Sequence, residues 1–137
     1  MKHRLHLRVL DDTLAICQLP PGTSSPAWAR GGELLAEIRA QHELTIVCRE
    51  RLVPVQVTAE RGWRAIMVQG PLAFSLTGVL AALAEPLARA DISIFALSTY
   101  DTDYVLVKCE SLELALHTLQ RAGHTILDQF NKAPDID

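Results

Sequence analysis

The pattern of apolar and polar residues is clearest in the second half of the chain. A nearly continuous apolar run over residues 63–68 predicts a strand that is covered on one or both faces. After a break at 69–71, apolar residues at spacings of three and four predict a helix from Ser75, its expected N-cap, to about Ala90. Pro86 predicts a kink inside that helix.

Clear strand and helix patterns continue toward the C-terminus. β-branched and aromatic residues predict strands at 92–98 and 103–109, which a turn at 100–102 joins into a hairpin. A serine and a glycine bound a second helix over 111–123, and a last strand follows at 124–127. The resulting order, β-α-β-β-α-β in roughly 65 residues, predicts an α+β fold of the ferredoxin-like type.

The first half of the chain has a weaker pattern. Residues 5–10, 13–19 and 44–48 are each typical of a strand. Residues 34–39 fit a helix or a strand equally well by periodicity, and residues 26–30 leave space for one helical turn. This half is therefore expected to be mostly β.

These patterns predict two domains and a tail. The first covers residues 1–61, with a linker from about residue 49, and the second covers 62–128. Residues 129–137 are expected to be a flexible tail.

Composition and charge exclude several classes of function. The 137 residues include 13 Lys+Arg and 16 Asp+Glu, and a net charge of −3 without a basic stripe argues against nucleic-acid binding. Neither a signal peptide nor a membrane span is expected, because polar residues and glycines interrupt the longest uncharged stretch. Three cysteines without metal-ligand spacing predict buried thiols in a cytoplasmic protein. No metal ion and no cofactor are expected, because no pair of histidines has metal-ligand spacing and no Gly-rich phosphate loop is present.

The ferredoxin-like order places three polar segments at one end of the sheet. These segments are the first helix start at 75–78, the hairpin turn at 98–103, and residues 123–124. A helix N-terminus suits a carboxylate, and an aspartate suits an ammonium or guanidinium group. Together they predict a site for a small zwitterion such as an amino acid, and the aspartates favour arginine or lysine.

Two of these segments also carry a family resemblance. Residues 70–80 and 94–104, the second containing Leu-Ser-Thr-Tyr-Asp-Thr-Asp, resemble an ACT domain. Residues 43–48 and 62–64 fit the same family, so the resemblance covers most of residues 13–127. More narrowly, the chain is similar to small bacterial tandem-ACT proteins related to aspartate kinase regulatory regions and to the CASTOR-type arginine sensors.

The resemblance implies two ACT-like units, of which the first is degenerate, with very short helices and a strand at 34–39. It also implies that an amino acid binds at an interface between ACT units. We expect a homodimer, because ACT-like sheets tend to pair side by side and an open sheet edge favours pairing.

Carried over by position, the resemblance implies that the helix start and the hairpin contact the ligand. The implied residues are Ser75, Leu76, Thr77, Gly78, Val79, Ser98, Thr99 and Asp103. Many ACT domains have Asp-x-Pro-Gly at the helix start, where this chain has Ser-Leu-Thr-Gly. Asp103 or Asp101 would therefore have to contact the ammonium group of the ligand.

Three functions stay open at this stage. The leading hypothesis is a non-enzymatic regulatory protein that senses an amino acid. The second is a small ferredoxin-like enzyme in which Asp103 or His124 acts as an acid or base. The third is an assembly module whose ACT site is inactive, so that Ser75 only caps a helix and the aspartates only stabilise a turn.

Overall fold

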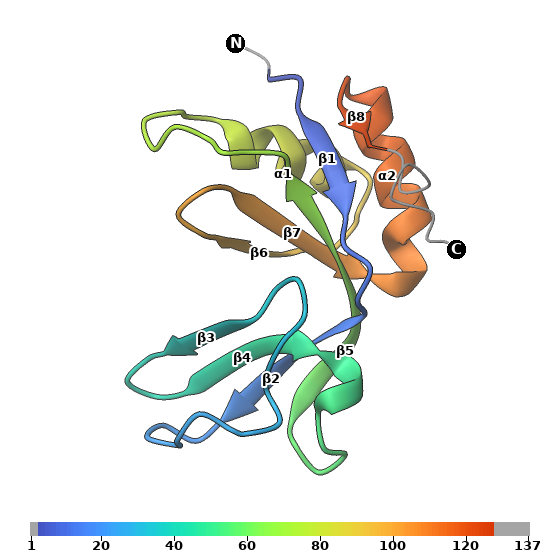
Figure 1. Cartoon of the computed structure of the whole chain (residues 1–137). Helices are drawn as coiled ribbons and strands as arrows, with labels where there is room; N and C mark the ends of the chain where they lie inside the picture. Colours follow the sequence, from blue (N-terminus) through green and yellow to red (C-terminus); the bar gives the residue numbers. More distant parts are fainter. Residues whose placement is uncertain (1–2, 128–137) are drawn as a thin grey trace, which may run out of the picture. The chain divides into compact units, whose positions relative to one another are not determined.

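The chain folds into two compact units (Figure 1), in a computed structural model that describes residues 3–127. Unit 2 is Asp11–Arg64, and unit 1 is the rest of the described chain, before and after it. Each unit is considered by itself below. None of the helices in the described residues has the length and apolar character needed to span a membrane.

Most of the regular structure is β-sheet. The strands are β1 (His6–Val9), β2 (Leu14–Leu19), β3 (Ala36–Arg39), β4 (Leu44–Arg49), β5 (Ala59–Val68), β6 (Phe95–Ser98), β7 (Asp103–Lys108) and β8 (Thr125–Ile126). The helices are α1 (Val79–Arg89) and α2 (Leu112–Arg121), and the 3-10 turns are η1 (Glu50–Leu52) and η2 (Cys109–Ser111).

Unit 1 contains the α+β ferredoxin-type order that the sequence predicted, from β5 through α1, β6, β7 and α2 to β8. Its strands lie in the order β6-β7-β5-β1-β8, and β1 pairs antiparallel with β5 and parallel with β8. The sequence analysis placed residues 5–10 in the first predicted domain, residues 1–61. The structure instead places β1 in unit 1, which otherwise contains the second half of the chain. The physical reason is apolar complementarity, because buried Leu7 and Val9 pair with buried Val68 and Ile66.

The two helices of unit 1 pack against each other and against β7. Val79, Leu83 and Leu87 recur every four residues on α1, and all three are buried. Ala115 and Leu119 do the same on α2, and they join one core with Ile66, Val105 and other strand residues. This stripe is the helical pattern that the sequence predicted.

The start of α1 differs from the expectation. The helix begins at Val79, and its N-cap is Gly78, which has a left-handed φ of 82°. The prediction that Ser75 caps this helix is therefore wrong, because a residue at this φ cannot lie inside a right-handed helix. The helix continues through Pro86 to Arg89.

His124 joins three elements of unit 1. Its ring is buried, with Nδ1 accepting from the backbone N–H of Leu5 at 3.1 Å and Nε2 donating to the carbonyl of Ala82 at 3.0 Å. Pro86 has no N–H, so the Ala82 carbonyl lacks its usual donor in α1. The imidazole supplies that donor and fixes the neutral tautomer.

Unit 2 is an antiparallel sheet in the order β3-β4-β2-β5. The structure describes all of Asp11–Arg64, and within it the only helical element is the 3-10 turn η1. Residues 34–39 include the strand β3, as the resemblance implied. The strand β5 begins at Ala59, earlier than the apolar pattern indicated, because Ala59 and Glu60 pair with β2.

Two of the three cysteines lie together in the core of unit 2. Cys17 and Cys48 are both buried on neighbouring strands. A hydrogen bond from the Cys48 thiol lowers the pKa of Cys17, with burial opposing and Arg61 adding to the effect. The same bond, together with burial, raises the pKa of Cys48. Cys109 is exposed, so its expected burial is wrong, because β7 ends at Lys108 and Cys109 begins η2.

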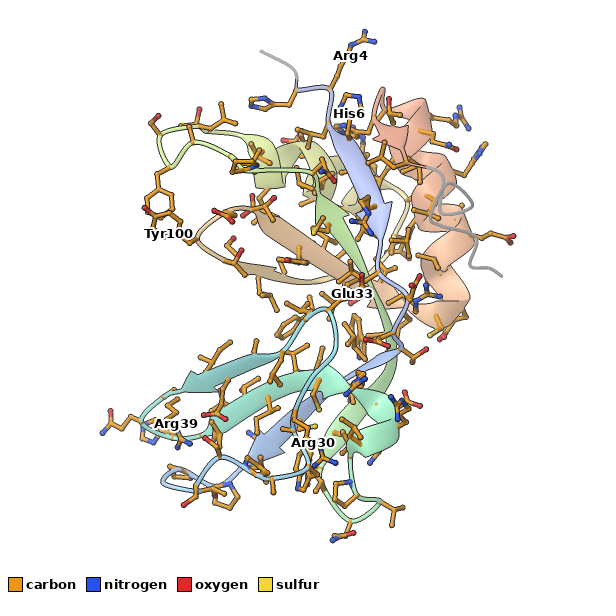
Figure 2. The ribbon with its side chains drawn as sticks, in the orientation of Figure 1. Arg4, His6, Arg30, Glu33, Arg39 and Tyr100 are labelled. Carbon is orange, nitrogen blue, oxygen red and sulfur yellow. The ribbon has the colours of Figure 1, made fainter. Side chains whose placement is uncertain are left out.

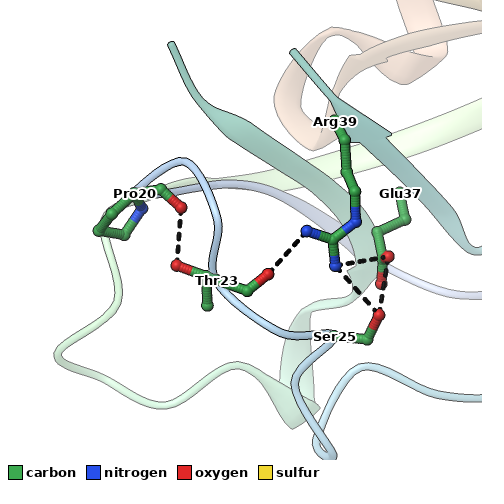
Figure 3. A network of polar contacts seen from close by, with 5 residues as sticks. All are labelled: Pro20, Thr23, Ser25, Glu37 and Arg39. Carbon is green, nitrogen blue, oxygen red and sulfur yellow. Dashed lines mark hydrogen bonds and ion pairs between the residues drawn. The ribbon is translucent and has the colours of Figure 1, made fainter. Parts of the chain in front are cut away.

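A polar network attaches the loop after β2 to the edge strand β3 (Figure 3). Arg39 donates to the Thr23 carbonyl at 2.7 Å and forms an ion pair with Glu37 at 3.2 Å. Ser25 donates to the same Glu37 carboxylate at 2.8 Å. The guanidinium group therefore connects loop backbone and strand side chains.

Replacing Arg39 with alanine is expected to loosen this loop without unfolding unit 2. Because the network is exposed, the free energy of unfolding should change by about 0.5 kcal/mol or less. Amide hydrogen exchange at residues 22–25 should accelerate several-fold, measured by NMR against an Arg51→Ala control. Unchanged exchange in this loop would show that the network does not order it.

Candidate functional site

Two loops of unit 1 meet at one end of its sheet, as the predicted topology required (Figure 1). One is the β5–α1 loop, residues 69–78, and the other is the turn between β6 and β7. The Thr102 hydroxyl donates to the Val68 carbonyl at 2.6 Å, and the Leu72 N–H donates to the Asp101 carbonyl at 2.7 Å. These two hydrogen bonds, one from a buried side chain and one between backbone groups, fix the position of the turn relative to the loop.

Gly70 makes this close approach possible. A Cβ atom at this position would lie 3.0 Å from the Asp101 carbonyl oxygen and 3.3 Å from the Cβ of Thr102. Any side chain here would therefore push the loop and the turn apart.

A hollow of about 300 Å³ lies between the loop, the turn and the start of α1; we call it the loop–hairpin pocket. Its lining residues are Leu72, Ala73, Phe74, Leu76, Val79, Ser98, Thr99, Tyr100, Asp101, Thr102 and Asp103. All of them belong to unit 1.

Five of the eight residues that the sequence placed in the site line this pocket: Leu76, Val79, Ser98, Thr99 and Asp103. Ser75, Thr77 and Gly78 are not among its lining residues. The carbonyl of Thr77 instead accepts a hydrogen bond from the His3 ring at 2.6 Å. Ligand contact by all eight residues stays a prediction.

Sequence reasoning missed the aromatic residues at the rim of the pocket. The rings of Phe74 and Tyr100 lie 4.7 Å apart, and their exposed fractions are 77% and 80%. Figure 2 shows Tyr100 at the turn between β6 and β7. The missed signal was that the β5–α1 loop and the β6–β7 turn each contain one aromatic residue. Exposed aromatic pairs suit apolar or cationic groups.

The pocket has a negative wall on its hairpin side. Its lining includes the carboxylates of Asp101 and Asp103 and no basic side chain. The Ser98 hydroxyl donates to Oδ1 of Asp103 at 2.5 Å, which fixes one carboxylate oxygen. The other oxygen can accept from a positively charged group.

The start of α1 forms another part of the wall, through Val79. The first turn of an α-helix has backbone N–H groups without helical partners. The N-cap Gly78 makes no side-chain capping bond, so the helix start can bind a carboxylate. The two walls together can hold the opposite charges of a zwitterion.

Asp103 and His124 do not form a catalytic pair in the structure. Asp103 lines the loop–hairpin pocket, whereas His124 is buried and both of its ring nitrogens are hydrogen-bonded to backbone groups. The geometry therefore gives no support to proton transfer between these two residues.

Two protein-family models match the chain. One, described as an ACT domain, matches residues 58–121. The other, described as an N-terminal domain, matches residues 12–56.

The curated relatives include a human protein. The cytosolic arginine sensor for mTORC1 subunit 1 of Homo sapiens is 40% identical over 60 residues, which are 43% of this chain and 18% of that protein. The chain thus spans less than a fifth of the length of this relative.

Solved structures extend the likeness over nearly the whole chain. A structural-genomics protein from Agrobacterium tumefaciens is 37% identical, with a TM-score of 0.86 over 91% of this chain and 93% of that chain. The ligand-free regulatory subunit of aspartate kinase from Thermus thermophilus is 14% identical, with a TM-score of 0.58 over 83% of this chain and 96% of that chain. At this lower identity the likeness concerns the fold alone.

Proposed function

The chain belongs to the ACT-domain family, and from this premise we propose that it is a non-enzymatic regulatory protein that binds a free amino acid in the loop–hairpin pocket. The observation that carries the proposal is that one hollow is lined both by Val79, the first residue of a helix without a side-chain cap, and by two aspartates. This arrangement complements the carboxylate and ammonium groups that every free amino acid carries.

The side chain of the ligand is proposed to be cationic, that of arginine or lysine. Once Asp103 holds the ammonium group, the lining still offers the Asp101 carboxylate and the exposed rings of Phe74 and Tyr100. Carboxylates and aromatic faces both attract guanidinium and ammonium groups. The human relative is named as an arginine sensor, which supports the same ligand class.

We further propose that the protein works as a cytoplasmic homodimer. Among the described residues, β6 pairs only with β7, so one edge of the unit 1 sheet is open to a second copy. The two family models match separate ranges, 12–56 and 58–121, which supports a division of the chain near residue 57. That the first of the two parts is a degenerate ACT-like unit remains part of the proposal.

Thermal unfolding of the protein with each of the twenty amino acids at millimolar concentration tests the proposal. A ligand at about 100 times its dissociation constant should stabilise the fold by roughly 2.7 kcal/mol, which raises Tm by several degrees. Arginine or lysine should give the largest shift, and glycine serves as the matched zwitterion without a side chain.

Two outcomes would contradict it. An absence of any shift would favour the assembly module with an inactive ACT site. A shift in Tm with apolar amino acids alone would support an amino-acid sensor, but it would refute the proposal that the ligand has a cationic side chain.

A further inference from the structure

Unit 1 contains a second hollow that shares no lining residue with the loop–hairpin pocket. Its volume is about 390 Å³, and it lies along α1 beside the end of α2; we call it the helix pocket. Ala81, Ala82 and Ala122 form part of its wall, and the buried His124 also lines it. Neither the proposed amino-acid site nor the fold requires this space to be occupied.

The charges around the helix pocket are predominantly positive. Arg89, in the last turn of α1, and Arg121, in the last turn of α2, both line it. The opposing charge in the lining is Glu85 alone. Two guanidinium groups and one carboxylate give this hollow a net charge opposite to that of the whole chain.

Neither guanidinium group is engaged elsewhere in the described part of the chain. Arg89 and Arg121 form no hydrogen bond and no ion pair with any residue of 3–127. Arg39 and Arg49, by contrast, each donate to backbone carbonyls of unit 2. Both arginines are exposed to solvent. The planar donor fork of arginine matches the two oxygens of a carboxylate or phosphate group, so two exposed forks that line one hollow are suited to bind an oxyanion there.

The His3 ring adds a further polar group to the same hollow. One of its ring nitrogens, Nε2, is hydrogen-bonded to the carbonyl of Thr77, and this bond holds the ring in the lining of the pocket. Its second ring nitrogen has no hydrogen-bond partner among residues 3–127, so it can contact a bound group.

We propose that the helix pocket is a second ligand site, which binds a small oxyanion through the guanidinium groups of Arg89 and Arg121. The ligand carries a carboxylate or phosphate group, which both arginines can contact by charge-assisted hydrogen bonds. Glu85 opposes this binding by like-charge repulsion and so limits its affinity. The helix pocket shares no lining residue with the loop–hairpin pocket, although Gly78, the N-cap of α1, lies in its wall. The proposal rests on Arg89 and Arg121 and does not depend on the proposed amino-acid site.

An NMR titration of the full chain with inorganic phosphate and with succinate, in the absence of amino acids, tests the proposal. At least one probe should shift the backbone amides of Ala81, Ala82 and Ala122 in a saturable manner. Saturation by succinate alone assigns a carboxylate ligand, and saturation by phosphate alone assigns a phosphate ligand.

The variants give effects of opposite sign. Arg89→Gln and Arg121→Gln should each weaken binding about tenfold, because each removes a charge-assisted contact. Glu85→Gln should tighten binding a few-fold, because it removes the repulsion. Arg8→Gln, the same change on β1 away from the pocket, should leave the affinity unchanged.

Two results would overturn the proposal. One is the absence of saturable shifts with both probes while the spectrum shows a folded protein. The other is an affinity that neither Arg89→Gln nor Arg121→Gln changes.

Discussion

Replacing Asp103 with asparagine is expected to weaken amino-acid binding roughly thirtyfold. The substitution removes the charge that is proposed to hold the ligand ammonium group, and a hydrogen bond to a charged group contributes about 2 kcal/mol. The fold should be unchanged, because an asparagine oxygen can still accept the hydrogen bond from Ser98. Isothermal titration calorimetry with the amino acid that gives the largest thermal shift measures the change.

Asp91→Asn is the matched control for this experiment. Asp91 is exposed on unit 1, lies outside the loop–hairpin pocket, and has a φ of 63°. Asparagine tolerates this left-handed conformation, so the control makes the same chemical change without strain. Equal affinities of Asp103→Asn and the wild-type protein would show that another group, such as Asp101, holds the ammonium group.

The location of the candidate site was predictable because it follows from topology. The order of strands and helices brings the β5–α1 loop and the β6–β7 turn to one end of the sheet, and the pocket lies between them. The side-chain pattern inside the loop was not predictable in the same way. A glycine with a left-handed φ, Gly78, moves the helix start three residues beyond Ser75.

The position of β1 was hidden for a related reason. Local periodicity identifies a strand but contains no information about its partner. Leu7 and Val9 fit the core of unit 1 through pairing with β5, which is distant in the sequence. Likewise, the spacing of Cys17 and Cys48 gave no hint that β2 and β4 bring the two thiols together.

His124 was considered for catalysis from its sequence position, but the structure indicates a role in stability. Replacing His124 with alanine is expected to lower the free energy of unfolding by about 3 kcal/mol. Two backbone groups, the N–H of Leu5 and the carbonyl of Ala82, would lose their partner in a buried environment. Urea unfolding followed by circular dichroism measures the loss, and His117→Ala, an exposed histidine on α2, is the control.

A double-mutant cycle with Pro86 tests the cause of this loss. Pro86→Ala restores a backbone N–H one turn after Ala82, so the Ala82 carbonyl regains a helical donor. His124→Ala should then cost about 1 kcal/mol less on the Pro86→Ala background than on the wild-type background. An equal cost on both backgrounds would mean that the Ala82 carbonyl does not depend on the imidazole, and that His124 stabilises the fold through Leu5 and packing alone.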